Sequence, residues 1–377
     1  MKRIKKIIYT MIALFIGTIA LIVIGGFLFL HFSPEFGGKA SEEQRLAYSK
    51  SDHFKKGKFV NYGDINMDLS GRDMLKAIGG MLKTIPHSVP DQNIETLKID
   101  SLDIIEYGPK TRLVWFGHST FLLQISNKII LVDPMLGTVP APHPMLGTKR
   151  FSDELPIAIE KIPFIDAVFF THDHYDHLDY GSVQKLKDKV KTFYTPLGVG
   201  AHLEAWGVAK ENIVELDWWE EVSFEELTFR CTPAQHFSGR GISDRAQTLW
   251  SSWIIQSPTE NLFFSGDSGY APHFKEIGER YGPFDLALLE CGQYNELWPT
   301  VHMFPEQTAM AGVDVNAKMI MPIHWGAFKL SHHTWTDPVE RVSRKAKELG
   351  IGIITPRIGE QIELDSMVIS EPNWWHQ

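Results

Sequence analysis

The sequence predicts an α+β fold, and three observations support this prediction. Short apolar runs recur between residues 113 and 323 and are separated by turn residues, a pattern that is typical of buried β-strands. Segments with helical spacing of apolar residues follow several of these runs. Near the N-terminus, one apolar run of about 25 residues is far longer than any strand and has the length of a membrane-spanning helix.

The composition is that of a globular protein and argues against nucleic acid as the main partner. Hydrophobic residues make up 44% of the 377 positions and charged residues 22%, which are ordinary values. The formal net charge is −9 and no long run of lysine or arginine occurs, so the chain lacks the basic face that binds phosphates. Cys231 and Cys291 form no C-x-x-C pair, and we expect two buried core thiols rather than a disulfide.

The N-terminal region predicts a single-pass membrane anchor. Residues 1–6 carry four basic side chains and precede the apolar run Ile7–Phe32. Positive charge before a spanning helix keeps the N-terminus in the cytoplasm, so we expect the rest of the chain outside the cytoplasm. A cleaved signal peptide is the alternative, although the run exceeds the usual length of its apolar region.

Residues 33–110 predict an extension between this anchor and the main domain, which we place at 111–370. Ser33–Lys58 is polar with glycines at its start, and it predicts a tether. Met74–Leu82 has helical spacing and predicts either a packed surface helix or a helix near the lipid.

The main domain is predicted as a series of strands with interspersed helices. Pro305 begins one helix and Gly350 ends another. The long loop Met135–Leu155 is rich in proline and glycine, and we place it near the mouth of a site. We expect strands at 113–116, 121–125, 129–132, 167–170, 192–194, 213–216, 222–224, 227–231, 249–255, 262–264, 286–289 and 319–323, helices at 181–186, 198–206, 305–313 and 338–349, and two final edge strands.

The stretch 171–177 predicts a metal site. It reads T-H-D-H-Y-D-H and directly follows an apolar strand. His172 and His174 are two positions apart, so in an extended chain they point the same way and can bind one ion. Asp176 and His177 follow and could bind a second ion. A chance cluster of solvated polar residues is the alternative.

Three later residues repeat this placement at the end of a strand. His236, Asp267 and His324 each follow an apolar strand and lie beside glycine or another small turn residue. Because ligand sites lie at the carboxyl ends of strands, their recurrence favours one shared site. Asp133 either orients a ligand histidine or caps a turn, and His118 is either a residue at the edge of the site or a turn residue.

These motifs resemble the metallo-β-lactamase fold superfamily. The resemblance includes W-F-G-H-S-T, T-H-D-H-Y-D-H-L-D, a later histidine, S-G-D and I-H-W-G, and it runs from Leu113 to Leu364. The similarity is greatest to N-acyl phosphatidylethanolamine-hydrolysing phospholipase D and its bacterial relatives, which share the F-x-x-G-K-F-V-N entry at Phe54–Asn61.

The resemblance implies an αββα sandwich with two zinc ions at one edge, iron or manganese being the alternatives. It also implies a hydroxide shared by the ions that attacks phosphorus, with Asp176 and His302 as catalytic residues. His302 would position the phosphate or protonate the leaving oxygen; the alternative is a helix-capping or solvent histidine. By similarity the first ion takes His172, His174 and His236, the second takes Asp176, His177 and His324, and Asp267 bridges them.

We therefore expect a membrane-anchored dinuclear zinc hydrolase that cleaves a phosphodiester bond in a phospholipid such as N-acyl phosphatidylethanolamine. A bridging Asp267 argues against β-lactam hydrolysis. Two alternatives remain: a hydrolase of small phosphorylated or lactone substrates, similar to ascorbate-6-phosphate lactonase, and a non-enzymatic metal-binding envelope protein. Four tryptophans are expected either to line an acyl-chain channel or to belong to the core, namely Trp218, Trp219, Trp298 and Trp325.

Overall fold

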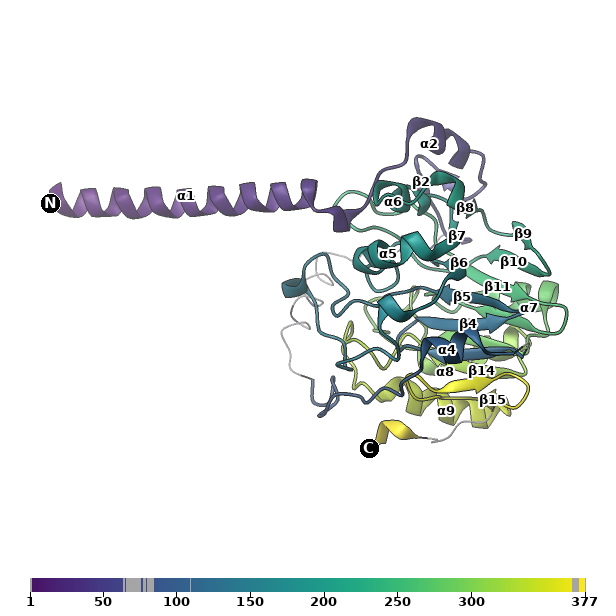
Figure 1. Ribbon diagram of the computed structural model, residues 1–377. Helices are drawn as coiled ribbons and strands as arrows, with labels where there is room; N and C mark the ends of the chain where they lie inside the picture. Colours follow the sequence, from purple (N-terminus) through teal and green to yellow (C-terminus); the bar gives the residue numbers. More distant parts are fainter. Residues whose placement is uncertain are drawn as a thin grey trace.

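A computed structural model describes residues 2–63, 65, 76, 79, 85–108, 110–367 and 373–376 of the chain. Most of the helix predicted at Met74–Leu82 lies outside the described residues. A long N-terminal helix projects from one side of the domain (Figure 1).

Two seven-stranded sheets form the centre of the domain. In each sheet, antiparallel strands at one end continue into parallel strands at the other. The first sheet has the order β16 (Gln361–Glu363), β3 (Arg112–Trp115), β4 (Phe121–Ile125), β5 (Lys128–Val132), β6 (Ile165–Phe169), β7 (Val190–Pro196), β8 (Ile213–Leu216). The second has the order β15 (Gly352–Ile353), β14 (Met319–Ile323), β13 (Leu286–Glu290), β12 (Asn261–Phe264), β11 (Ser252–Gln256), β10 (Leu227–Thr232), β9 (Glu221–Phe224).

The main hydrophobic core lies between the two sheets. Phe169 of β6 meets Phe229 of β10 with ring centroids 4.8 Å apart and Trp253 of β11 at 5.0 Å. All three side chains are fully buried. Burial of such aromatic side chains contributes about 1.5–3 kcal/mol each, so this contact fixes how the two sheets face each other.

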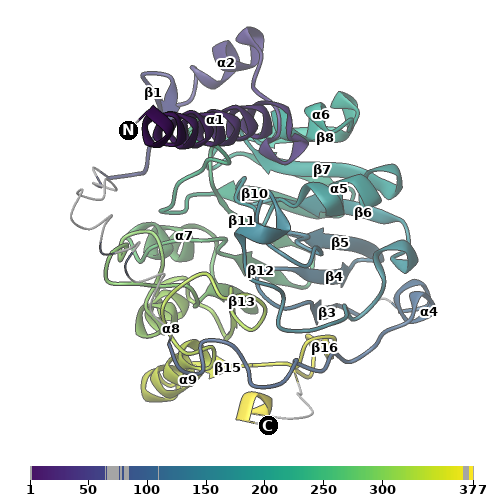
Figure 2. The same cartoon turned by 90° about the vertical axis from the view of Figure 1, so that its left-hand side faces the viewer.

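Helices cover the outer faces and complete the αββα sandwich that the resemblance implied (Figure 2). The helices beside the first sheet are α4 (Ser101–Ile105), α5 (Tyr180–Leu186) and α6 (Gly200–Ala205), and those beside the second are α7 (His273–Tyr281), α8 (Pro305–Asp314) and α9 (Asp337–Leu349). Helix α9 ends at Gly350, which has the left-handed φ of 71° expected at such a position. Both cysteines are free and buried, as predicted.

The segment after the long helix is packed on the domain, where the sequence predicted a tether leading onto the domain surface at Ser33–Lys58. It contains α2 (Glu42–Tyr48) and the short strands β1 (Phe54–Lys55) and β2 (Lys58–Phe59). Tyr48 and Phe59 are only 2% exposed and belong to the main core. Apolar side chains scattered through a polar stretch therefore bind this segment to the sandwich.

Helix α1 (Lys2–Phe32) has no buried residues in its apolar window and is long and apolar enough to cross a membrane. Its apolar side chains include Leu14, Phe15 and Leu21, each more than 60% exposed. A helix that is apolar on all sides and largely exposed is unfavourable in water, which is consistent with a lipid environment.

Candidate metal centre

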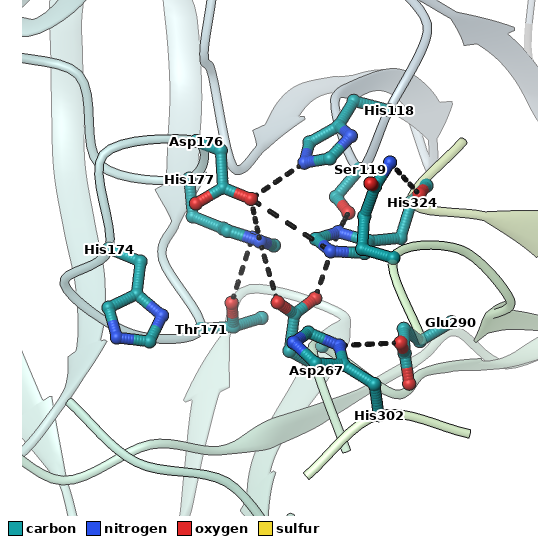
Figure 3. Close-up of polar contacts among 12 residues, drawn as sticks. His118, Ser119, Thr171, His174, Asp176, His177, Asp267, Glu290, His302 and His324 are labelled. Carbon is teal, nitrogen blue, oxygen red and sulfur yellow. Dashed lines mark hydrogen bonds and ion pairs between the residues drawn. The ribbon is translucent and has the colours of Figure 1, made fainter. Parts of the chain in front are cut away.

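Loops that follow the strands of both sheets deliver seven histidine and aspartate side chains to one place. Figure 3 shows His174, Asp176, His177, Asp267 and His324 among them. The loop after β6 contributes four of them, which are His172, His174, Asp176 and His177. His236 follows β10, Asp267 follows β12 and His324 follows β14. The structure thus brings together all seven residues that the sequence singled out as metal ligands.

The first group consists of three imidazoles without a carboxylate. His174 Nδ1 lies 2.9 Å from His172 Nε2 and 3.2 Å from His236 Nε2. Further contacts orient the rings, since His236 Nδ1 donates to the Val301 carbonyl at 2.9 Å and His172 Nδ1 lies 3.0 Å from Thr171 Oγ1. Three ring nitrogens therefore converge on one point.

Burial keeps these three imidazoles neutral. It lowers the pKa of His172 and His236 well below the usual value and that of His174 to about 4. Each protonated ring would also be repelled by the neighbouring imidazoles. A cluster of neutral ring nitrogens has lone pairs available for a cation.

The second group combines a carboxylate with two imidazoles, and each has a partner that holds it. Asp176 Oδ2 accepts a hydrogen bond from His118 Nε2 at 2.8 Å. His324 Nδ1 lies 3.1 Å from Ser119 Oγ. His177 Nε2 lies 3.4 Å from Asp176 Oδ2, and its other nitrogen is bound to a buried carboxylate described below.

Asp267 lies between the two groups. Its Oδ2 is 3.8 Å from Nε2 of both His172 and His236, which belong to the first group. The same oxygen is 3.2 Å from His177 Nε2, and Oδ1 is 3.1 Å from His324 Nδ1 in the second group. A carboxylate in this position can bind one ion with each oxygen.

The ionisation of the second group differs from that of the first. Burial alone would lower the pKa of His177, but Asp267, Asp176 and Asp133 raise it well above the usual value. Burial opposes ionisation of Asp176, and the positive charges of His177 and His118 outweigh it and lower its pKa. Burial raises the pKa of Asp267 to about 6.

Asp133 orients His177. Of the two roles predicted for Asp133, the structure therefore supports orientation of a ligand histidine over capping of a turn. Its Oδ2 accepts from His177 Nδ1 and from Thr171 Oγ1, both at 2.7 Å, and its Oδ1 accepts from the Thr171 amide at 2.8 Å. The Asp133 side chain is fully buried and its φ is 40°. The chain therefore holds a strained backbone here to aim this carboxylate at His177.

His118 belongs to the site, as its predicted edge position implied. Its ring centroid lies 4.1 Å from that of His324. The backbones of these two residues are also joined, since the His324 amide donates to the His118 carbonyl at 2.9 Å. Both residues have left-handed φ values, 55° for His118 and 66° for His324. The backbone hydrogen bond between them therefore stabilises both turns.

His302 approaches the cluster from the loop before α8 and is held by a buried carboxylate (Figure 3). Its Nδ1 lies 2.8 Å from Glu290 Oε1, and its ring lies 5.1 Å from that of His236 and 5.4 Å from that of His324. Glu290 is fully buried, and burial raises its pKa well above the usual value. Contact with the cluster argues against the alternative of a solvent histidine.

A second buried support lies behind the loop 171–177, and no motif in the sequence predicted it. The Arg240 guanidinium is buried and donates from Nη1 to the carbonyls of Asp173 at 2.5 Å and Leu178 at 2.8 Å. Asp173 Oδ1 accepts from the Gly239 amide at 2.8 Å. Glu290 and Arg240 were missed because each acts through a contact with residues distant in sequence.

The residues present fit a pair of divalent cations. Seven buried or nearly buried nitrogen and oxygen donors face one another, and His177 Nε2 and Asp267 Oδ1 lack hydrogen-bond partners within the described chain. Buried polar atoms without partners are costly, and a cation between the groups would bind both. Imidazole and carboxylate donors suit zinc, iron or manganese.

Two of the four tryptophans considered for an acyl-chain channel are structural. Trp218 and Trp325 are 4% and 1% exposed and belong to the main core. Trp325 stacks on Trp374 with centroids 5.6 Å apart. The structure therefore assigns these two side chains to packing.

Comparison with known proteins agrees with this geometry. The family described as Beta-lactamase superfamily domain matches residues 128–325, more than half of the chain. An uncharacterized protein of Mycobacterium tuberculosis is 38% identical over 352 residues, which cover 92% of this chain and 93% of that protein. N-acyl-phosphatidylethanolamine-hydrolyzing phospholipase D 1 of Caenorhabditis elegans is 31% identical over 250 residues, 62% of this chain and 70% of the relative.

Among solved structures, isothiocyanate hydrolase from Delia radicum gut bacteria superimposes with a TM-score of 0.54 at 24% identity. The match covers 67% of this chain and 98% of that one, and at this identity it supports the fold alone. The chain therefore belongs to the β-lactamase superfamily-domain family, and it is a metallo-β-lactamase-type hydrolase with a histidine and aspartate cluster able to hold metal.

Proposed function

We propose that this protein is a membrane-anchored dinuclear zinc hydrolase that cleaves a phosphodiester bond in a phospholipid, in the manner of a phospholipase D. The observation that carries this proposal is Asp267, which lies within ion-pair distance of histidines from both ligand groups. The first ion would be held by His172, His174 and His236. The second would be held by Asp176, His177 and His324.

Zinc, when bound, would lower the pKa of a water molecule toward neutrality and offset negative charge on the phosphate oxygens. The protein's own residues would then set geometry and move protons. Asp133 and His118 keep His177 and Asp176 in place. His302, held by Glu290, is placed to donate a proton to the leaving oxygen or to orient the phosphate.

A phospholipid substrate is favoured by two independent observations. The relative from C. elegans carries the activity in its name and aligns with 62% of this chain. Helix α1 would hold the domain at a membrane through Ile7–Phe32, with the N-terminus in the cytoplasm and residues 111–370 outside. An enzyme held at a lipid surface meets a phospholipid substrate in two dimensions.

The test is to purify the full chain, measure its metal content, and assay bis-(p-nitrophenyl) phosphate and N-acyl phosphatidylethanolamine. We expect two equivalents of metal and turnover of both substrates. A metal-loaded protein that hydrolyses neither would favour a binding protein of the envelope. Turnover of lactones in place of diesters would favour the second candidate, a hydrolase of small phosphorylated or lactone substrates.

A further inference from the structure

The segment that directly follows helix α1 is fixed to the domain beside the metal loop. The Trp206 Nε1 donates to the Pro34 carbonyl at 2.7 Å, and Arg240 Nε donates to the Glu35 carbonyl at 2.8 Å. The Gly38 amide donates to His202 Nδ1 at 3.1 Å. Three hydrogen bonds over five residues therefore set how the domain sits relative to the helix.

These contacts reach the candidate metal centre directly. Phe36 packs on Tyr175 with ring centroids 6.4 Å apart, and Tyr175 belongs to the loop that carries the metal-binding histidines. Arg240 joins the carbonyl of Glu35 to that of Asp173 in the same loop. The side of the domain that faces the end of α1 is thus the side on which the metal loop lies.

Two loop tips on this side expose large apolar side chains. Met145 and Leu146, in the single helical turn η2 (Pro144–Leu146), are 87% and 65% exposed. Ile242, in the loop after β10, is 83% exposed. Exposed apolar side chains at isolated loop tips need no explanation, but these come from separate loops and flank the same helix.

Both tips lie beside the last turns of the apolar helix. The ring of His143, next to η2, lies 6.1 Å from that of Phe29, which is within the apolar run. Ile242 lines a cavity of about 390 Å³ whose lining also includes Phe27 and Leu30. If α1 crosses a bilayer, these levels of the helix lie at or inside the boundary of the hydrocarbon region.

We infer that η2 and the Ile242 loop form a docking face that inserts into the surface of the same bilayer that α1 spans. The apolar tips of Met145, Leu146 and Ile242 enter the acyl boundary, and the fixed segment Pro34–Gly38 holds the metal loop directly behind them. The inference rests on the proposed membrane anchoring. The inference adds that the metal loop is held at a set distance and orientation from the membrane that supplies the substrate.

Spin labelling tests the inference without measuring catalysis. The native Cys231 and Cys291 are buried, so a label on an added surface cysteine is selective. M145C and I242C would be labelled in the full chain in phosphatidylethanolamine–phosphatidylglycerol vesicles. I105C is the matched control, because Ile105 is 60% exposed on α4, away from α1 in both views (Figures 1 and 2).

We expect labels at positions 145 and 242 to collide more with oxygen, which dissolves in lipid, than with a water-soluble nickel complex. The label at position 105 should show the opposite order. Equal access of the nickel complex to all three positions would overturn the inference. Protection of positions 145 and 242 from both reagents would indicate a protein partner or a second copy, and would overturn it too.

A pair of charge variants then connects the face to turnover. M145E/L146E and I242E should lower the rate of hydrolysis of vesicle phospholipid by about tenfold. This fall is smaller than the full free energy of burying these apolar side chains in lipid would produce. Hydrolysis of soluble bis-(p-nitrophenyl) phosphate should stay at the wild-type rate, as should both activities of I105E. An equal fall in both activities would contradict a role at the lipid surface. If the wild type hydrolyses neither, the proposed function fails while the labelling result still stands.

Discussion

The two halves of the candidate metal centre are built differently. The first half consists of three imidazoles that burial keeps neutral, and its outer contacts are a hydroxyl and a backbone carbonyl. The second half contains a carboxylate, and charged or polar side chains hold each of its members. Desolvation therefore sets the ionisation of the first half, whereas a network of charges sets that of the second.

The largest expected effect comes from the residue that joins the halves. Asp267→Asn removes the charge that faces histidines of both groups, so we expect activity to fall by about 10³-fold or more, with loss of metal. His174→Ala should be equally severe because His174 lies at the centre of the first group. Circular dichroism should show a retained fold, and near-wild-type rates from either variant would refute the ligand assignment.

His302→Ala tests whether catalysis involves more than the two halves. We expect a fall in kcat of about 10²–10⁴-fold, the usual contribution of a general acid, with metal content unchanged. Glu290→Gln should have a smaller effect, because an amide can still hold the His302 ring. His332→Ala is the control, since His332 bonds to Asn295 and lies outside the clusters of potential metal ligands. Loss of metal from the His302 variant would mean that it is a ligand.

Asp133→Asn should weaken only the second half. Removal of a carboxylate that orients a ligand histidine costs about 10–100-fold in metal affinity or activity. Competition with a chromogenic chelator should therefore show one weakened equivalent and one unchanged. Asp166→Asn is the control, because Asp166 accepts from the Ile129 amide in the same sheet. Equal weakening of both equivalents would show that the halves are not independent.

Lowering the pH should remove metal from one half of the site before the other. This is the smallest of the expected effects near neutral pH. In the metal-free protein the pKa of His177 is raised, so protons compete with metal there already near neutral pH. The pKa of His174 is lowered to about 4, so the first half stays available to metal at lower pH. Metal content after dialysis at falling pH should drop by one equivalent first, and loss of both together would contradict this difference.

The same shifts act on stability with opposite signs. Because the pKa of His174 is lowered to about 4, its contribution to the free energy of unfolding is complete above the usual value of 6.5 and is lost as pH falls toward 4. His177 contributes below its usual pKa, and its contribution is lost as pH rises through the raised value.

Most of the sandwich could be predicted because its signals are local. Apolar strands that end in histidine or aspartate mark β6, β10, β12 and β14, and the resemblance placed them in one fold. Segment 33–58 could not be predicted, since its packing depends on partners such as Glu215, which accepts from Tyr48 Oη at 3.0 Å across 167 positions. Helix α7 was missed because it is amphipathic but rich in charged residues.

Site residues divide in the same way. The ligand candidates carry a recognisable spacing, whereas Glu290 and Arg240 do not. Glu290 is the last residue of the apolar strand β13, yet its partner His302 lies twelve positions away in a loop with no periodic pattern. Arg240 donates to carbonyl groups of Asp173 and Leu178, each more than sixty positions from it in the sequence, and no local pattern in the sequence reveals such a contact.

The close approach of Gly37 and Gly38 to the domain has a practical consequence for protein engineering. A side chain at Gly37 would lie 2.1 Å from His202 Nδ1, and one at Gly38 would lie 2.3 Å from the Ala201 carbonyl oxygen. A water-soluble version, or a chimera with a foreign anchor, should therefore be joined before Pro34 and keep both glycines. A junction placed after Pro34 would remove part of the segment that packs on the domain as well as the membrane anchor.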